Sequence, residues 1–281
     1  MNISIINDPF MQHAILATLL AGVVCPLIGV LVVTMRLSFI GVSLAHAAFA
    51  GALLGLILGV NSAIMALIFS VIAAGILGPL ADRGDFSPDT AMGVMFTSAL
   101  GLSFLFLSLI PGPETEALGL LWGGVLTVTQ TELGFLAGVT LVTLLTLLLF
   151  YKEVCAVLFQ REIAESTGIP ATTIFYGILL FCGLAITSSL NIIGGMLVFC
   201  LIINPAAAAY QLTYRLSTMF GLSVLIGVLS GWLGLIFSCI FNLPTGALII
   251  VTSSAFFLVT ITFSPKRKVH FQTIPKDGNY G

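Results

Sequence analysis

Charge is the scarcest feature of this sequence. Only 9 of its 281 residues are Lys or Arg and 11 are Asp or Glu, so charged residues make up 7% of the chain, against about 25% in typical soluble domains. A soluble globule needs a polar shell around its core, and this composition excludes a water-soluble enzyme. A net charge of -2 with scattered bases offers no basic patch, which excludes a nucleic-acid-binding protein.

Motifs of soluble catalysis are missing as well. The sequence contains no G-x-x-x-x-G-K-[ST] phosphate loop, no nucleophile elbow and no H-E-x-x-H zinc motif. Its five cysteines show no C-x-x-C spacing, which indicates neither a disulfide framework nor a thiolate metal site. We therefore expect a chain that is not an enzyme and binds no cofactor. If it moves a solute uphill, the energy must come from an ion gradient or from a separate ATPase.

Long apolar runs are what the sequence has instead. Hydrophobic residues make up 59% of the chain and gather in continuous runs of about 20 residues, each long enough to cross a hydrocarbon core about 30 Å thick. Strands of a transmembrane barrel would alternate in segments of about ten residues. The predicted fold class is therefore an all-α polytopic membrane protein. Its nine expected spans lie near residues 11–34, 39–59, 61–80, 90–110, 132–151, 172–189, 191–209, 217–241 and 245–263.

The distribution of Lys and Arg predicts how these spans are oriented, because positively charged residues near span ends stay in the cytoplasm. Every base follows an odd-numbered span, namely Arg36, Arg83, Lys152, Arg161, Arg215, Lys266, Arg267, Lys268 and Lys276. The opposite side holds Asp8, Glu114, Glu116 and Glu132. We therefore expect a multi-pass protein of the plasma (inner) membrane with its N-terminus outside and its C-terminus in the cytoplasm.

Domain organisation follows from the short connections between spans, which leave no room for a separate soluble domain. The first nine residues contain no Lys or Arg, so we expect no cleavable signal peptide. The sequence predicts one transmembrane domain over residues 1–281, with a helical bundle over 10–263 and a cytoplasmic tail over 264–281.

Two segments are not simple spans. Residues 151–170 form the longest polar stretch between spans and predict a short cytoplasmic helix, with Gly168 and Pro170 as its stop. This helix is either an ordinary interfacial connector or a docking element for a partner. The external 111–131 segment begins with Pro111 and contains an apolar run too short to cross. It predicts a re-entrant or interfacial element with Trp122 at the headgroup level.

Polar residues inside the spans are candidate pathway residues, because ionisable groups are costly there. His46 alone lies deep, and imidazole is a common ligand of zinc and manganese, although hydrogen bonding to a neighbouring helix also explains it. Asn204, which precedes Pro205, either lines a cavity or bonds another helix. His13 with Glu114 and Glu116 suggests an outer vestibule that attracts cations, and three solvated side chains explain them equally well.

Several motifs in order along the chain resemble one membrane protein family. They are the stretch 35–51 (MRLSFIGVSLAHAAFAG), DTAMG at 89–93, LWGGVL at 121–126, IGGML at 193–197, INPAA at 203–207 and LPTG at 243–246. Together they resemble the permease subunits of the zinc, manganese and iron ATP-binding cassette importers, the ABC-3 family, from about residue 10 to 263. The resemblance implies the permease fold with a cytoplasmic coupling helix.

The resemblance also implies partners and substrate. In this family two permease copies pair with a dimer of cytoplasmic ABC ATPases, and an extracytoplasmic metal-binding protein delivers the ion. ATP is then bound by the partner subunit, and a divalent metal, zinc or manganese and possibly iron, is the substrate. Membrane lipid surrounds the chain, and no nucleic acid is expected. The implied mechanism is alternating access, switched by the ATPase through the coupling segment.

The coupling segment of the family usually reads Phe-Asp-x-Glu-x-Ala-x-x-x-Gly. Here the matching positions are Phe159, Gln160, Glu162, Ala164 and Gly168. The resemblance assigns the ATPase contact to these residues. Gln160 replaces the usual acid, so any contact which that acid makes is changed.

A second departure concerns the metal. The family commonly has Gly-Asp-x-x-x-His in the second span, with the carboxylate one turn before the histidine on the same helix face. Val42 stands in place of that acid, so His46 remains with Ser43 as a weak oxygen donor. We expect a transit site of lower affinity, one weighted toward zinc, or one built from other helices.

Two other classes compete with this interpretation. A gradient-driven secondary transporter of a metal ion or small solute would favour buried carboxylates, and no Asp or Glu lies deep in a predicted span. An intramembrane enzyme would need an acid or nucleophile paired with His46. Copurification with an ATPase would separate the three.

Overall fold

The computed structural model describes residues 8–82, 87–110, 124, 128–264 and 266. The regular secondary structure of these residues is helical, and the figures number the helices in chain order. Their bounds are α1 Pro9–Thr34, α2 Ile40–Leu58, α3 Ser62–Asp82, α4 Pro88–Leu109, α6 Gln130–Leu149, α7 Tyr151–Phe159, α8 Arg161–Ser166, α9 Ala171–Ile193, α10 Gly195–Leu212, α11 Leu216–Phe241 and α12 Thr245–Thr262.

Nine of the described helices are long and apolar enough to cross a membrane, all except the short α7 and α8. They match the nine predicted spans in order, and most ends agree within two residues. The boundary between the sixth and seventh spans differs, because Asn191 belongs to α9 and the chain turns at Gly194 instead. Gly194 has φ 85° and ψ 150°, a conformation that residues with a Cβ rarely adopt.

The predicted external element at 111–131 lies almost wholly outside the described residues, and so do Trp122, Glu114 and Glu116. The predicted cytoplasmic helix is present as two helices, α7 and α8. Gln160 separates them in an extended conformation, with φ −154° and ψ 99°. The sequence analysis predicted a single helix here, so the division at Gln160 corrects it.

Local sequence signals fix several helix starts. Thr129 caps α6, with its Oγ1 accepting from the amide of Glu132 at 3.3 Å while its own amide donates to Oε2 of Glu132 at 3.0 Å. Ser87 caps α4 by accepting from the amide of Thr90 at 3.2 Å. Such caps satisfy amides that have no partner within the helix, so both helices begin where a hydroxyl residue precedes the apolar run.

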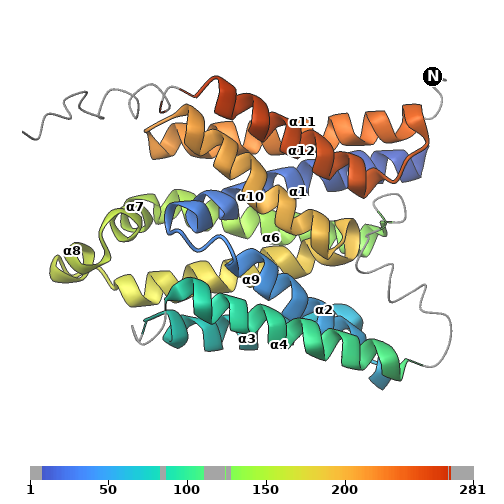
Figure 1. The fold of residues 1–281 in the computed structure, drawn as a ribbon, viewed down its shortest axis with the longest axis horizontal. Helices are drawn as coiled ribbons and strands as arrows, with labels where there is room; N and C mark the ends of the chain where they lie inside the picture. The colour runs from blue at the N-terminus through green and yellow to red at the C-terminus, as the bar shows by residue number, and fades with distance from the viewer. Residues whose placement is uncertain (1–7, 83–86, 111–123, 125–127, 265, 267–281) are drawn as a thin grey trace, which may run out of the picture.

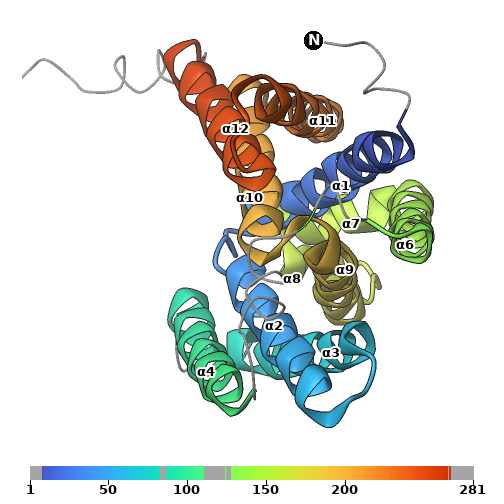
Figure 2. The ribbon, with the colours of Figure 1, turned by 90° about the vertical axis from the view of Figure 1, so that its right-hand side faces the viewer.

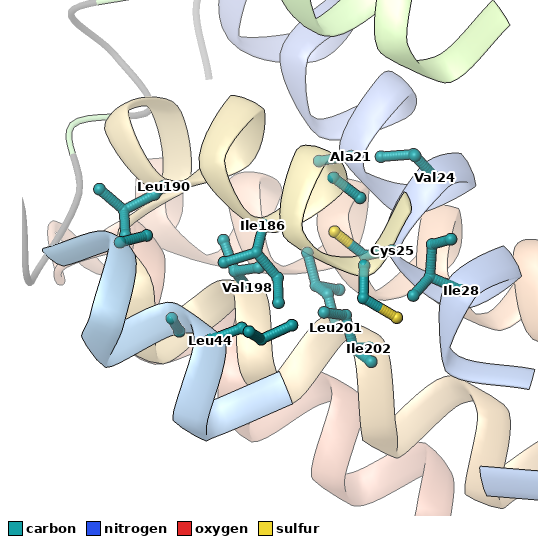
Figure 3. Close-up of a cluster of buried hydrophobic side chains, with 14 of the residues drawn as sticks. Ala21, Val24, Cys25, Ile28, Leu44, Ile186, Leu190, Val198, Leu201 and Ile202 are labelled. Carbon is teal, nitrogen blue, oxygen red and sulfur yellow. The ribbon is translucent and has the colours of Figure 1, made fainter. Parts of the chain in front are cut away.

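A core of buried apolar side chains lies where α1, α2, α9 and α10 meet. Figure 3 shows buried side chains of these four helices packed together, with Cys25 of α1, Leu44 of α2, Ile186 of α9 and Leu201 of α10 among those labelled. Gly29 of α1 lies against α10 so closely that a Cβ there would overlap the carbonyl oxygen of Ile202. Without a hydrophobic force between helices in lipid, close approach of this kind supplies much of the packing energy.

Two groups of helices flank this core, with α6 beside them. In Figure 2, α2, α3 and α4 form one group, and α10, α11 and α12 lie on the other side of the bundle. Helix α6 stands at the perimeter, where it packs on α1 and α9. Its outward side chains are apolar and exposed, for example Leu141, Leu148 and Leu149, as expected for a helix that faces lipid.

One end of the bundle gathers the basic segments. The α1–α2 connection, α7 and α8, the α10–α11 connection and the end of α12 all lie at the left in Figure 1. The described bases belong to these segments, namely Arg36, Lys152, Arg161, Arg215 and Lys266. The charge asymmetry read from the sequence is therefore an asymmetry between the two ends of the folded bundle.

Candidate functional site

His46 lies on α2 and is half-buried. Its Nδ1 atom is 3.0 Å from the carbonyl oxygen of Val42, one turn earlier on the same helix. Because a carbonyl oxygen only accepts hydrogen bonds, Nδ1 is the donor in this contact, and in the neutral imidazole Nε2 then keeps its lone pair. Histidines that bind metals commonly hold their second nitrogen in this way, bonded to a carbonyl or a carboxylate. The arrangement leaves His46 able to offer one nitrogen ligand.

Helix α4 supports this histidine from the side. The ring of Phe96 packs edge-on against the imidazole, with 4.9 Å between centroids and 86° between planes. The hydroxyl of Ser103 donates to the backbone carbonyl of His46 at 3.4 Å, and to that of Ala99 at 2.8 Å. These contacts limit the orientations that the ring can adopt.

Ser43, the other predicted ligand on α2, is fully buried. Its hydroxyl lies within donor distance of two carbonyl oxygens, 2.8 Å from that of Met92 on α4 and 3.0 Å from that of Phe39. The single hydrogen of this hydroxyl serves one of these two carbonyls or is shared between them. Val42 is half-buried beside His46 and offers no ligand atom in its side chain.

No group of three or more His, Cys, Asp or Glu side chains among the described residues could hold a metal ion. A resident metal centre needs three or four protein ligands. Within the described residues His46 therefore stands without the two partner ligands from this set that such a centre requires.

Asn204 of α10 bonds another helix. Its Nδ2 donates to the hydroxyl of Ser254 on α12 at 3.0 Å. Of the two explanations that the sequence left open, the structure contains the interhelical hydrogen bond. His13, also named as a pathway candidate, is half-buried in the first turns of α1.

The predicted coupling residues lie together at the basic end of the bundle. Phe159 is 69% exposed, and Gln160 and Glu162 are exposed as well. Ala164 is buried in a small apolar cluster with Val157 and Ala171. An open groove of about 550 Å³ runs along this face of α7 and α8, lined by Ala156, Phe159, Gln160, Ile163, Ala164 and Thr167.

Gly168 ends this segment as predicted. It has φ 85°, and its amide donates to the carbonyl of Glu165 at 3.1 Å while the amide of Ile169 donates to that of Ala164 at 3.0 Å. A left-handed residue just beyond the last turn satisfies the free carbonyls of a helix end, and glycine adopts that conformation without strain. The chain then leads directly into Pro170 and α9.

A set of contacts that the sequence interpretation missed fixes α8 to α9. The Nη2 atom of Arg161 donates to the hydroxyl of Thr172 at 2.9 Å, and that hydroxyl donates to Oε1 of Glu165 at 2.9 Å. The guanidinium of Arg161 also lies 5.1 Å from the ring centroid of Phe175. The spacing of Arg161 and Glu165 by four residues was the available signal, but Thr172 and Phe175 carry no signal of this contact in the sequence.

Comparisons with known proteins agree with this fold. The model of the ABC 3 transport family matches residues 7–264. The manganese transport system membrane protein MntC of Halalkalibacterium halodurans is 32% identical over 265 residues, which cover 94% of this chain and 91% of the relative. The manganese import system permease protein ScaB of Streptococcus gordonii is 29% identical over 259 residues, covering 92% and 93%.

A solved structure gives the same result in three dimensions. The structure of PsaBC from Streptococcus pneumoniae in complex with Fab superposes with a TM-score of 0.84 at 27% identity, over 95% of this chain and 96% of that chain. The match extends over essentially the whole bundle, which confirms the all-helical permease fold expected from the motifs.

Proposed function

Because the chain belongs to the ABC 3 transport family, we propose that it is the membrane-spanning permease subunit of an ATP-binding cassette importer that carries a divalent transition metal ion into the cytoplasm. Manganese is the first candidate substrate, because the relatives MntC and ScaB are named for its transport. Zinc is the second, since a site that rests on imidazole without a carboxylate favours zinc over manganese.

The observation that carries this proposal is the hydrogen bond that orients the imidazole ring of His46. Its Nδ1 is bonded to the carbonyl of Val42 at 3.0 Å, so Nε2 is the nitrogen that a passing cation can bind. A single imidazole binds weakly, and a carrier needs a site that the ion enters and leaves. We assign His46 as a transit ligand, with Ser43 confined to helix packing in this conformation.

The orientation proposed for the chain places the basic end of the bundle in the cytoplasm. Helix α8 lies at that end with α7, together with the described bases (Figure 1). Positively charged residues near the ends of spans remain on the cytoplasmic side. The groove along α7 and α8 then faces the compartment in which an ATPase hydrolyses ATP.

We assign the exposed face of α7 and α8 as the docking surface for that ATPase. Phe159, Gln160 and Glu162 offer one apolar, one amide and one acidic side chain beside the groove. The contacts of Arg161 and Glu165 with Thr172 connect α8 to the first turn of α9, a span that packs on α1, α2 and α3. A displacement of α8 is thereby passed to the core of the bundle.

The remaining partners follow from the same proposal. A second copy of the permease completes the membrane part, and an extracytoplasmic metal-binding protein delivers the ion. ATP is bound by the ATPase subunits and not by this chain. The permease then alternates between outward and inward exposure as the ATPase cycles.

Metal uptake into vesicles tests the proposal. The chain is reconstituted with its ATPase and binding protein, and uptake of manganese, zinc and iron is followed with ATP present or absent, with and without an ionophore that removes ion gradients. We expect ATP-dependent uptake that survives the ionophore. Uptake that needs a proton or sodium gradient but no ATP would assign the chain to the secondary transporters instead.

A further inference from the structure

A cavity of about 350 Å³ lies away from His46 and from the coupling groove, between α1, α6, α7 and α9. Its wall is largely apolar, with Leu31 of α1, Leu147 and Phe150 at the end of α6, and Ile174 and Phe181 of α9. Nothing in the proposed transport path uses this space. An apolar wall excludes a metal ion, so the cavity calls for an occupant of different chemistry.

The length of the cavity matches one leaflet of a bilayer. It runs along α9 from Pro170, the residue that precedes the helix, to Phe181. At 1.5 Å per residue this stretch covers about 16 Å, close to half of a hydrocarbon core about 30 Å thick. The end of the cavity near Pro170 lies with α7 and α8 at the basic end of the bundle. The cavity therefore spans the depth that an acyl chain occupies in that leaflet.

The position of the cavity makes it accessible to lipid. Helix α6 forms one wall and stands at the perimeter of the bundle, as Figure 2 shows. Neighbouring side chains on α6 that point outward, such as Leu144 and Leu148, are exposed and apolar. A chain that leaves the bilayer beside α6 can enter without crossing polar protein.

Of the polar residues in the wall, which are Thr143, Thr146, Glu153 and Thr173, Thr143 and Glu153 indicate which kind of lipid fits. Thr143 is 1% exposed, and its hydroxyl has no hydrogen-bond partner among the described residues. Thr140, one turn before it, donates to the carbonyl of Leu136 at 2.7 Å. A buried hydroxyl without a partner costs free energy, and an acceptor oxygen in the cavity, such as a phospholipid ester oxygen, would satisfy it.

Glu153 of α7 is the second polar group, and it lines the cavity at its basic end. Its carboxylate forms no ion pair within the described part of the chain. A carboxylate at this depth repels fatty acids and lipids with anionic headgroups, and attracts a protonated amine. The wall thus combines an apolar body, a hydroxyl donor and an acidic entrance.

We propose that this cavity binds a phospholipid with a primary-amine headgroup, a phosphatidylethanolamine, with its acyl chain between α6 and α9 and its ammonium beside Glu153. The leaflet concerned is the cytoplasmic one, an assignment that rests on the proposed orientation. Because Glu153 and Val154 belong to α7, the bound lipid packs directly against the helix that leads into α8.

Photolabelling in vesicles tests the site. The full chain is reconstituted in phosphatidylcholine vesicles that contain a small fraction of phosphatidylethanolamine with a diazirine in its acyl chain. A second preparation contains phosphatidylglycerol with the same chain. After illumination, the labelled residues are mapped by mass spectrometry. We expect severalfold more label on the cavity residues of α6 and α9 from the ethanolamine lipid than from the glycerol lipid. Equal label from both lipids, or label spread evenly over the exposed leucines of α6, would overturn the proposal.

Filling the cavity supplies a matched pair of variants. Gly177 lines the cavity, and a Cβ built there has open space around it, so Gly177→Leu is expected to abolish the cavity label. Gly221 on α11 is equally open and lies outside the cavity wall, so Gly221→Leu should label like the natural chain. Unchanged labelling in Gly177→Leu would refute the cavity as the binding site.

The headgroup is tested without a change of shape. Glu153→Gln removes the charge and keeps the side-chain volume, so the preference for ethanolamine over glycerol lipid is expected to disappear while both still label. A preference that persists in this variant would refute the role of Glu153. Label that vanishes when the ATPase binds would assign the cavity to the partner and not to lipid. Each of these outcomes is read without metal transport, so a failure of the proposed transport function leaves them unchanged.

Discussion

The Nδ1 atom of His46 lies 3.0 Å from the carbonyl oxygen of Val42, so the residue that replaces the acid of the family motif still orients the histidine through its backbone. The side chain at position 42 is free to vary without loss of this bond. The side chain at position 42 instead sets the number of metal ligands on this helix face, because a carboxylate there would lie one turn from the imidazole. Two predictions follow from separating these roles.

The first prediction concerns the histidine itself. His46→Ala removes the Nε2 ligand, and we expect ATP-driven metal uptake by the reconstituted complex to fall about tenfold or more, the change that a loss of about 1.4 kcal/mol of ion binding produces. The variant should assemble normally, because the ring is only half-buried and its loss removes one edge-on contact with Phe96. Uptake is measured with radioactive manganese or zinc.

Phe96→Leu is the matched control for this variant. It disturbs the same aromatic contact and removes no ligand atom, so uptake should stay close to that of the natural chain. Natural rates in His46→Ala would take the histidine out of the path, and an equal loss in both variants would assign it a packing role.

The second prediction restores the carboxylate. Val42→Asp places a hard oxygen ligand beside His46, and oxygen ligands suit manganese better than a lone imidazole does. We expect the dissociation constant for manganese to fall about tenfold, or about 1.4 kcal/mol, with a smaller change for zinc. Val42→Asn, which has the same shape and no charge, should leave both constants nearly unchanged. Identical manganese binding in the Asp and Asn variants would contradict a site at this position.

Much of the fold could be predicted because the bilayer imposes its thickness on the sequence. Each apolar run had to be about 20 residues long, and hydroxyl caps such as Thr129 and Ser87 mark where two of them begin. The predicted boundary between the sixth and seventh spans, at 189–191, was wrong because α9 continues to Ile193. The turn is made by Gly194. Because Gly195 is also a glycine, the sequence does not show which of the two makes the turn.

The candidate site could be predicted only in part, for a different reason. His46 was identifiable because an ionisable side chain in a span is rare. The hydrogen bond from Ser43 to the carbonyl of Met92 joins residues 49 positions apart in the sequence. The bond from Asn204 to Ser254 joins residues 50 positions apart. Contacts of this kind depend on how helices are placed around one another, which no pattern within one helix specifies.

The third prediction addresses the coupling surface. Glu162 is exposed in the first turn of α8, so Glu162→Arg reverses a charge on the proposed docking face and leaves the fold intact. We expect the ATPase of the complex to lose its stimulation by metal and binding protein while basal hydrolysis continues. Asp89→Arg reverses an exposed acid in the first turn of α4, outside the coupling segment, and should keep the stimulation. Full stimulation in both variants would refute the docking assignment.

The fourth prediction concerns the end of the coupling segment. Gly168 has φ 85°, and proline fixes φ near −65° and removes the amide, which here donates to Glu165 at 3.1 Å. Gly168→Pro is therefore expected to displace α8 and to abolish metal-stimulated hydrolysis. Hydrogen exchange of the amides of α8 should become faster in the same variant. Slow exchange together with normal stimulation would show that this turn does not position the segment.

The last prediction treats the bond between α10 and α12 as a measurable energy. Asn204 Nδ2 donates to Ser254 Oγ at 3.0 Å, and polar pairs between membrane helices average about 0.6 kcal/mol in double-mutant cycles. A cycle of Asn204→Leu and Ser254→Ala, read from thermal unfolding in detergent, should give a coupling energy of about this size. The control cycle pairs Asn204→Leu with Thr262→Val, whose exposed hydroxyl bonds only its own helix, and should give none. If the first cycle also gives none, the bond contributes nothing to holding the two helices together, and the amide of Asn204 is free to serve the ion path instead.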